Sequence, residues 1–189
     1  MNVNGEVKSP WSDERLKNDY EALKYISEKT TIPVPKIHHF TDVSGGVFEL
    51  KMERVYGVPL SSITNNREEA VAVVDEFIKT EVLPTLVALV EEEGSKTWKP
   101  RVSNVAEFSF CHNDLAQQNI LVDIDSCRVE GIIDWEFSGF YTPEFEAPFW
   151  KTSPDTEGYY DIGADRLDNL TKLLSYPQNR CPDTVIGKA

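Results

Sequence analysis

Four polar side chains with the potential for chemistry lie close together in the second half of the sequence. His112, Asp114 and Asn119 fall within the stretch FCHNDLAQQNILVD, just before an apolar run, and a second apolar run, VEGIID, ends on Asp134. The two β-rich runs are joined by IDSCR, a pattern that predicts a β-hairpin. Because the two ends of a hairpin meet, we expect the four side chains to converge there.

This combination of side chains suits phosphoryl transfer. One carboxylate can orient an acceptor hydroxyl, while an amide oxygen and a second carboxylate can hold magnesium ions that bridge the phosphates of a nucleotide. The spacing H-x-D-x-x-x-x-N is that of the kinase catalytic loop, and Asp134 takes the place of the metal-binding aspartate. Taken singly, Asp114 also fits a cap, Asn119 a turn former and Asp134 a solvated carboxylate at a strand end. The joint arrangement favours the kinase-like interpretation.

The stretches HNDLAQQNILVD and GIIDWEFSGFYTPEFE together resemble the aminoglycoside phosphotransferase and choline kinase branch of the protein-kinase-like fold, in the form common among fungal proteins. In that branch the second motif usually reads I-D-W-E. The resemblance implies that Asp114 is the catalytic base, that Asn119 and Asp134 bind Mg²⁺, and that His112 supports the loop. It also implies ATP as the nucleotide.

The resemblance extends upstream into a nucleotide-binding lobe. DYEALKYI and IPVPKI resemble the helix and linker of the family's N-lobe, which implies that Glu21 is the partner of a nucleotide-binding lysine. FELKMERVYGVPL resembles the strand and hinge whose backbone binds adenine, near Glu53 to Val55. The family places a Gly-rich hairpin and a lysine before that helix, whereas this chain offers only MNVNGEVKSP. Lys8 is the candidate for the lysine, and we expect an N-lobe that lacks its first strands.

Helix and strand signals outside these motifs fit the same arrangement. An acidic start followed by apolar residues at helical spacing predicts a helix over residues 12–29, and the alternation in VFELKM predicts a strand. A long helical stretch over residues 67–93 begins with the pattern of a capping box, Asn66 followed by Glu69. Pro84 should kink this helix.

We therefore expect an α+β protein with the protein-kinase-like, two-lobe fold. Residues 1–57 would form a partial, β-rich N-lobe that ends at the hinge. Residues 58–189 would form a mainly helical C-lobe that carries the catalytic β-hairpin. The boundary falls in ERVYGVPLSSI, where Gly57 and Pro59 separate a strand-rich part from a helical one. A last helix is expected between Ile162 and Leu174.

Composition narrows the choice of partners. With 19 basic and 32 acidic residues the net charge is −13, so the protein as a whole would repel nucleic acid and anionic membrane surfaces. The three cysteines show no C-x-x-C spacing, which favours neither a disulfide framework nor a cysteine-based zinc site. No apolar run approaches the roughly 20 residues of a membrane span, and the start of the chain lacks a signal-peptide pattern. We expect a cytoplasmic protein.

The sequence thus predicts an ATP-dependent phosphotransferase that moves the γ-phosphoryl group to a hydroxyl of a small molecule. Glu136, Glu144 and Glu146 would suit an amine-bearing acceptor, such as an aminoglycoside or a choline-like compound. The alternative is a catalytically impaired kinase-like module that binds a partner. A metal-free hydrolase based on Asp114 and His112 is a third interpretation, which no serine in a nucleophile elbow supports.

Overall fold

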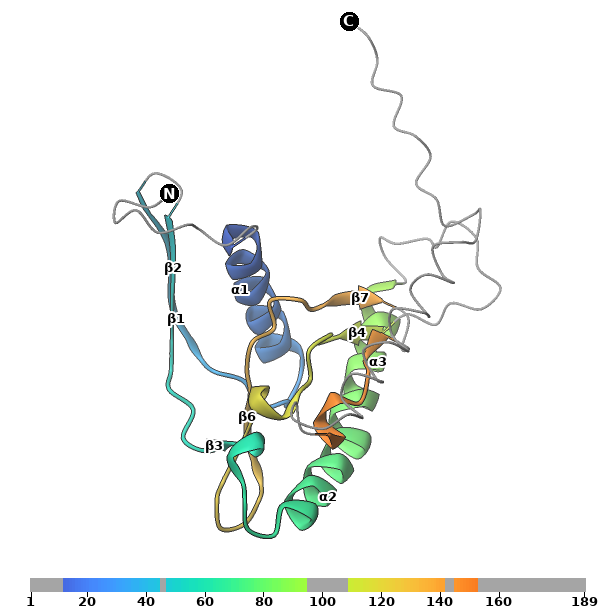
Figure 1. Ribbon diagram of the computed structural model, residues 1–189. Helices are drawn as coiled ribbons and strands as arrows, with labels where there is room; N and C mark the ends of the chain where they lie inside the picture. Colours follow the sequence, from blue (N-terminus) through green and yellow to red (C-terminus); the bar gives the residue numbers. More distant parts are fainter. Residues whose placement is uncertain (1–11, 45–46, 95–108, 142–144, 153–189) are drawn as a thin grey trace, which may run out of the picture.

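The computed structural model describes residues 12–44, 47–94, 109–141 and 145–152 (Figure 1). Helix α1 (Ser12–Lys29) has Asp13 and Glu14 in its first turn and Lys29 in its last, so its charged ends complement the helix dipole. It confirms the helix predicted over residues 12–29. Its apolar face, which includes Leu23 and Ile26, is buried in the core.

A two-stranded antiparallel sheet follows α1. Strand β1 (Ile37–Ser44) pairs with β2 (Val47–Met52), which confirms the strand predicted from VFELKM. Aromatic rings join this sheet to the helix: the rings of Tyr20 and Phe40 stack with centroids 4.3 Å apart, and Phe40 stacks on Phe48 at 5.8 Å. The sheet therefore lies alongside α1, as Figure 1 shows.

The predicted hairpin is confirmed. Strands β5 (Ile120–Val122) and β6 (Val129–Ile132) are antiparallel, and the short strand β3 (Val58–Pro59) pairs with the other edge of β5. The turn between β5 and β6 is closed by the Asp123 side chain, whose Oδ1 accepts hydrogen bonds from Asp125 N and Ser126 N. Through this sheet, β3, which follows the hinge, pairs with β5, which follows the loop that contains Asp114.

The long helical stretch contains three parts: α2 (Arg67–Phe77), a π-helical turn η2 (Ile78–Val82) and α3 (Leu83–Gly94). The predicted kink at Pro84 takes the form of this π turn, in which Leu83 N–H donates to the carbonyl of Ile78. The wider turn accommodates a proline ring that would clash with the carbonyl four residues earlier in an α-helix.

The capping box predicted at the start of α2 is wrong. Asn66 is the N-cap residue but makes no side-chain cap hydrogen bond. Its φ of 53° is left-handed, whereas a capping side chain requires an extended backbone at that position.

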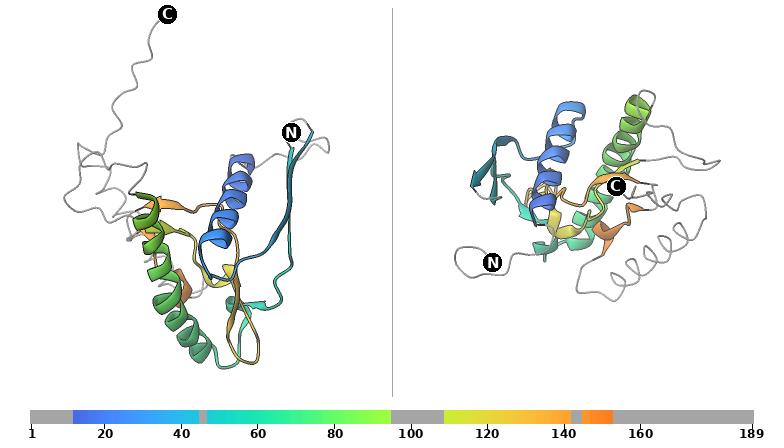
Figure 2. Two further views of the ribbon diagram at one scale, coloured as in Figure 1. Left: turned by 180° about the vertical axis from the view of Figure 1, so that it is seen from behind. Right: turned by 90° about the horizontal axis from the view of Figure 1, so that it is seen from above.

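One core connects these elements. Strand β4 (Ser109–Cys111) pairs with β7 (Gly139–Tyr141), and the 3₁₀ turn η5 (Phe149–Lys151) lies against α2. Buried apolar side chains from α1, from α2 to α3 and from the hairpin form a single cluster. In Figure 1 the hairpin lies below α1 and beside the start of α2, and Figure 2 shows these elements from two further directions. The last predicted helix lies outside the described residues.

Candidate active site

The catalytic-loop pair is joined by direct hydrogen bonds. The loop leaves β4 at Cys111 and enters β5 through the 3₁₀ turn η3 (Gln117–Asn119). Asn119 Nδ2 donates to the backbone carbonyl of Asp114 at 2.9 Å and to its carboxylate Oδ2 at 3.0 Å. Asn119 is buried and Asp114 is half-buried. The amide therefore fixes the Asp114 carboxylate in one orientation while leaving part of it accessible.

His112 supports this loop through hydrogen bonds to backbone groups and carries no charge. Its ring is fully buried; Nδ1 accepts from Asp114 N–H at 3.2 Å, and Nε2 lies 3.0 Å from the carbonyl of Ile133. An amide N–H only donates and a carbonyl only accepts, so the proton is on Nε2. Burial lowers the pKa of His112 to about 4, although the bond to Ile133 opposes the shift. His112 thus links the catalytic loop to the residue that precedes Asp134.

The turn η3 is anchored to α2 and η5. Gln117 is buried, accepts from the Arg67 guanidinium at 2.5 Å and donates to the carbonyl of Trp150 at 2.9 Å. Trp150 in turn donates from its indole N–H to Asp75 at 2.9 Å. These bonds hold the turn that carries Asn119 against the rigid long helix.

Asp134 stands at the end of β6 in an uncommon conformation. Its φ is 68°, in the left-handed region that residues other than glycine seldom adopt. The residue is exposed, yet its surroundings remove enough water from the carboxyl group to raise its pKa, against the effect of nearby Arg15. Within the described residues no hydrogen bond ties up its carboxylate, which leaves it available to a ligand.

Asp134 and Asn119 line one cavity together with the hinge. The cavity has a volume of about 450 Å³. Its walls come from α1, the linker, the hinge and the hairpin: Asp19, Pro35, Met52, Glu53, Arg54, Val55, Asn119, Leu121, Ile133 and Asp134. Three carboxylates (Asp19, Glu53 and Asp134) and the amide of Asn119 are among these residues, so the cavity has polar as well as apolar lining.

The structure brings together six of the eight residues predicted from the sequence. His112, Asp114, Asn119 and Asp134 converge through the contacts above, and Glu53 and Val55 line the same cavity. Glu21 is exposed on α1 and is not among the lining residues. Lys8 lies outside the described residues.

The sequence interpretation missed Asp19, the acidic side chain of α1 that does reach the cavity. Asp19 is buried, and its Oδ1 accepts from the backbone N–H of Trp135 at 2.9 Å. Burial raises the pKa of Asp19 to about 6; the Trp135 bond opposes this shift and the charge of Asp134 adds to it. The available signal was its place on the helix: it shares a face with the core residues Ala22, Leu23 and Ile26 rather than with the exposed Glu21.

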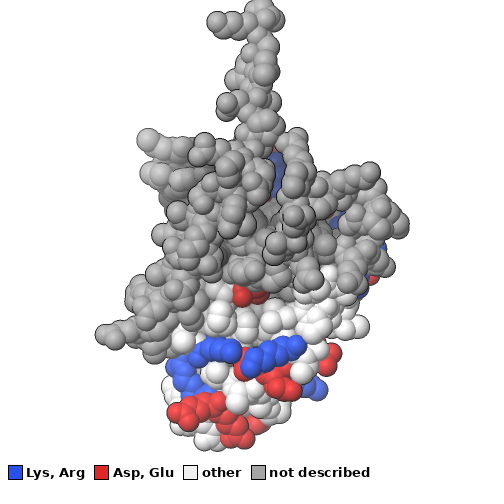
Figure 3. Space-filling model, turned by 90° about the vertical axis from the view of Figure 1, so that its right-hand side faces the viewer, with Lys and Arg blue, Asp and Glu red and all other residues white. Residues whose placement is uncertain are grey.

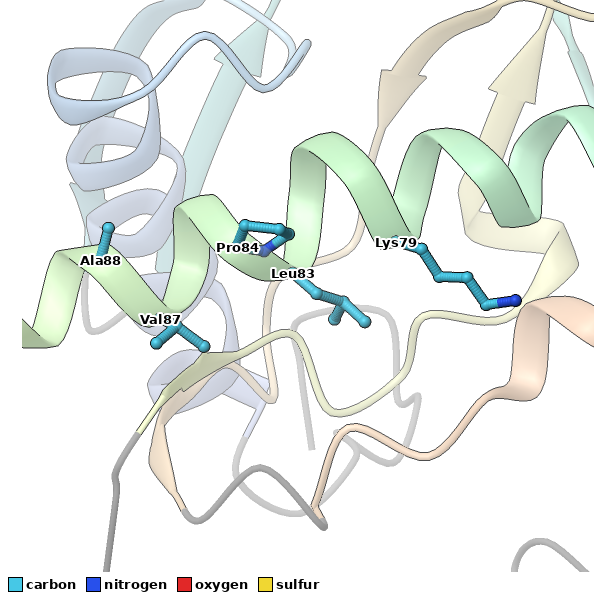
Figure 4. Close-up of a pocket in the computed structure, with 5 residues that line it drawn as sticks. All are labelled: Lys79, Leu83, Pro84, Val87 and Ala88. Carbon is cyan, nitrogen blue, oxygen red and sulfur yellow. The ribbon is translucent and has the colours of Figure 1, made fainter.

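A second cavity of about 450 Å³ lies along the long helix, where Figure 4 shows its lining residues Lys79, Leu83, Pro84, Val87 and Ala88. Among the described residues, Lys79 is its one charged side chain, and it pairs with Asp75 at 2.6 Å. It therefore offers an apolar surface without groups for catalysis. In the described part of the chain, no three His, Cys, Asp or Glu side chains form a metal-binding group, and no helix is long and apolar enough to cross a membrane.

The chain was compared with protein families, curated proteins and solved structures. Residues 95–150, which contain Asp114, Asn119 and Asp134, match the phosphotransferase enzyme family. None of the curated proteins compared with the chain matches it. Among solved structures, the aminoglycoside-3'-phosphotransferase of type VIII is 20% identical, with a TM-score of 0.54 over 85% of this chain and 74% of that one.

Two structures of a thermostable mutant of the aminoglycoside phosphotransferase APH(4)-Ia are also similar. The apo form is 13% identical, with a TM-score of 0.52 over 84% of this chain and 70% of that one. A ternary complex with AMP-PNP and hygromycin B is 14% identical, with a TM-score of 0.52 over 82% and 70%. At these identities the likeness concerns the fold. The chain therefore has the protein-kinase-like fold of the aminoglycoside phosphotransferases, and its catalytic-loop segment matches the phosphotransferase enzyme family.

Proposed function

We propose that the protein transfers the γ-phosphoryl group of ATP to a hydroxyl of a small molecule. The observation that supports this proposal is the hydrogen-bonded pair of Asp114 and Asn119, because Asn119 lines a cavity that Asp134 and the hinge also line. A phosphotransferase needs an oriented carboxylate, oxygen ligands for a metal and a nucleotide pocket side by side.

Asp114 is the residue we propose as catalytic base. The acceptor oxygen attacks the γ-phosphorus, the bond from that phosphorus to the bridging oxygen of ADP breaks, and the hydroxyl proton moves to Asp114. The hydrogen bond from Asn119 Nδ2 holds the carboxylate in place for this role. Neutral His112 has both ring nitrogens occupied by backbone groups, so its part is to position the loop.

The oxygen donors at the cavity fit magnesium. Mg²⁺ binds through one or two protein carboxylates, with water and phosphate oxygens as the remaining ligands. Asp134 supplies a carboxylate without a hydrogen-bond partner among the described residues, and Asn119 lines the same cavity with an amide. We propose these two residues as its ligands. When bound, Mg²⁺ would neutralise charge on the phosphates.

The hinge from Glu53 to Val55 is our proposed adenine site, since it lines the same cavity as Asn119 and Asp134. We also propose that the boundary between the N-lobe (1–57) and the C-lobe (58–189) falls at the hinge, and that Lys8 is the nucleotide-binding lysine. The complex of APH(4)-Ia with AMP-PNP and hygromycin B supports a nucleotide and an aminoglycoside-like acceptor. With ATP as the donor, we propose a cytoplasmic location.

The test is an isosteric change of the proposed base. Asp114→Asn removes the proton acceptor, so we expect turnover with a panel of aminoglycoside and choline-like acceptors to fall by roughly 10²- to 10⁴-fold. Binding of ATP, followed by the rise in thermal midpoint, should persist because the hinge and Asp134 are unchanged. Asp125→Asn makes the same chemical change in the exposed hairpin turn and should leave turnover as in the unaltered protein.

Turnover that survives in Asp114→Asn would refute the assignment of the base. If the unaltered chain binds no Mg²⁺ and ATP at millimolar concentrations, the non-catalytic kinase-like module becomes the better description.

A further inference from the structure

One face of helix α1 holds the loop that follows Asp134. Asn18 and Asp19 follow Arg15 by three and four residues, which places the three side chains on the same side of the helix. All three contact residues 135–138, which lie 116 to 121 residues later in the chain.

Two of these side chains bind the loop through its backbone. Asn18 Nδ2 donates to the carbonyl of Glu136 at 2.9 Å and to the carbonyl of Ser138 at 3.0 Å, so both amide hydrogens have acceptors. Asp19 accepts from the N–H of Trp135 at 2.9 Å. Donors and acceptor on the helix therefore match acceptors and donor on the loop, whatever side chains the loop carries.

Arg15 adds a weaker contact. Its guanidinium forms an ion pair with Glu136 and lies 4.8 Å from the centroid of the Phe137 ring. Its side chain is 36% exposed, and partly exposed ion pairs of this kind contribute little to stability because solvent screens them. Asn18, with two backbone bonds, is the stronger anchor.

The loop needs such an anchor because of the conformation of Asp134. A left-handed backbone is unfavourable for a residue with a Cβ, and it persists only where the surrounding structure fixes it. On the upstream side, Ile133 is held by bonds to Asn119 and His112. On the downstream side, Asn113 Nδ2 donates to the carbonyl of Phe137 at 2.9 Å, and the bonds to α1 hold Trp135, Glu136 and Ser138.

We propose that Asn18 is a positioning residue of the metal site: by holding the carbonyls of Glu136 and Ser138, it keeps Asp134 at the cavity and so sets the affinity for Mg²⁺. This inference rests on the proposed function, because it takes Asp134 as a Mg²⁺ ligand. The placement of α1 and the metal site are then coupled.

The experiment compares Asn18→Ala with Lys24→Ala, an exposed position on the same helix. Without ligand, hydrogen exchange of the backbone amides of residues 134–138 should become faster in Asn18→Ala only. With saturating ATP, the Mg²⁺ concentration for the half-maximal rise in thermal midpoint should increase about tenfold or more, as for other residues that orient metal ligands. Excess Mg²⁺ should restore the full rise, which a general loss of stability would not allow.

Unchanged hydrogen exchange in Asn18→Ala would overturn the proposal. Faster exchange with an unaltered Mg²⁺ requirement would also overturn it, because the contact would then serve the fold alone. If the unaltered protein shows no Mg²⁺-dependent rise, the proposed function fails and the metal role of Asn18 with it, while the exchange result still decides whether Asn18 holds the loop.

Discussion

Two buried titratable residues flank the Asp134 loop, and both are held toward the neutral form. The pKa of His112 is lowered to about 4 and that of Asp19 is raised to about 6, in each case chiefly by burial. Their effects on stability oppose each other. His112 takes up a proton more readily when the chain unfolds, so its contribution to the free energy of unfolding rises with pH between about 4 and 6.5. Asp19 is protonated more readily in the folded state, so its contribution falls as pH rises from about 4 to 6.

Replacing Asp19 with Asn should remove the second effect alone. The Asn side chain can still accept the hydrogen bond from Trp135 N–H, but it cannot ionise. We expect the variant and the unaltered protein to have similar free energies of unfolding near pH 4. At pH 7 the variant should be more stable by about 3 kcal/mol, because the pKa of Asp19 lies at about 6 in the folded protein instead of at its usual 3.8.

Urea denaturation at several pH values in EDTA measures this difference, with Asp125→Asn as the control at an exposed carboxylate. A difference between variant and unaltered protein that stays constant from pH 4 to 7 would contradict the raised pKa.

The sequence was sufficient for residues whose chemistry is encoded locally. His112, Asp114 and Asn119 belong to one short loop, and a hairpin fixes their distance from Asp134, so spacing alone predicted their convergence. Asn18 and Asp19 escaped prediction because their partners lie more than a hundred residues away, and an Asn or Asp on a helix has many ordinary explanations.

At the scale of elements, the close packing of β6 against the hinge is the tightest constraint on the cavity. Gly131 lies where a Cβ would be 2.8 Å from Cγ1 of Val55, nearer than atoms normally approach. Val55 is β-branched, so its side chain has few alternative rotamers. Any side chain at position 131 would therefore displace the proposed adenine site.

Gly131→Ala should destabilise the protein by about 1–3 kcal/mol through overpacking. In the double variant with Val55→Ala the conflict disappears, so we expect the two changes to couple favourably by roughly 1 kcal/mol. Denaturation of the two single variants and the double variant gives this coupling.

Gly139→Ala is the matched control for that experiment, because the three atoms nearest to a Cβ there all belong to the ring of Tyr141 and none to the hinge. Strictly additive effects of the changes at positions 131 and 55 would argue against the contact.

Helices and strands were predicted correctly where the periodicity of apolar residues determines the structure. The prediction failed where one backbone angle determines it. The helix over residues 12–29 and the hairpin follow from apolar spacing. The capping box at Asn66 did not form, because the chain enters α2 with a left-handed residue that no pattern of side chains reveals. Pro84 marked the right place for a break but not its form.

For the whole molecule, the excess of acidic residues is the dominant electrostatic feature. Basic and acidic side chains nonetheless lie side by side in the described part of the face shown in Figure 3. Ion pairs among the described residues include Lys79 with Asp75 and Arg128 with Glu130. Such exposed pairs contribute little, whereas a net charge of −13 repels itself over the whole compact state.

Salt should therefore stabilise the protein. Raising NaCl from about 20 mM to about 500 mM shortens the Debye length from roughly 20 Å to about 4 Å, and we expect the thermal midpoint to rise by a few degrees. The rise should be smaller near pH 5, where fewer carboxylates are charged. A midpoint that falls with salt at pH 7 would show that local ion pairs outweigh the general repulsion.

The π-helical turn has a consequence for the phase of the long helix. Its buried residues Ala70, Val74, Ile78, Val82 and Leu86 recur every four positions. In an α-helix each such step overshoots a full turn by about 40°, so the row would wind around the helix and leave the core. The wider turn between Ile78 and Val82 subtracts rotation midway, and the row stays on one side. Deleting one exposed residue from this turn would replace one step of four by a step of three, whose shortfall of about 60° offsets the overshoot of the other steps. The second half should then keep its buried face toward the core in an uninterrupted α-helix.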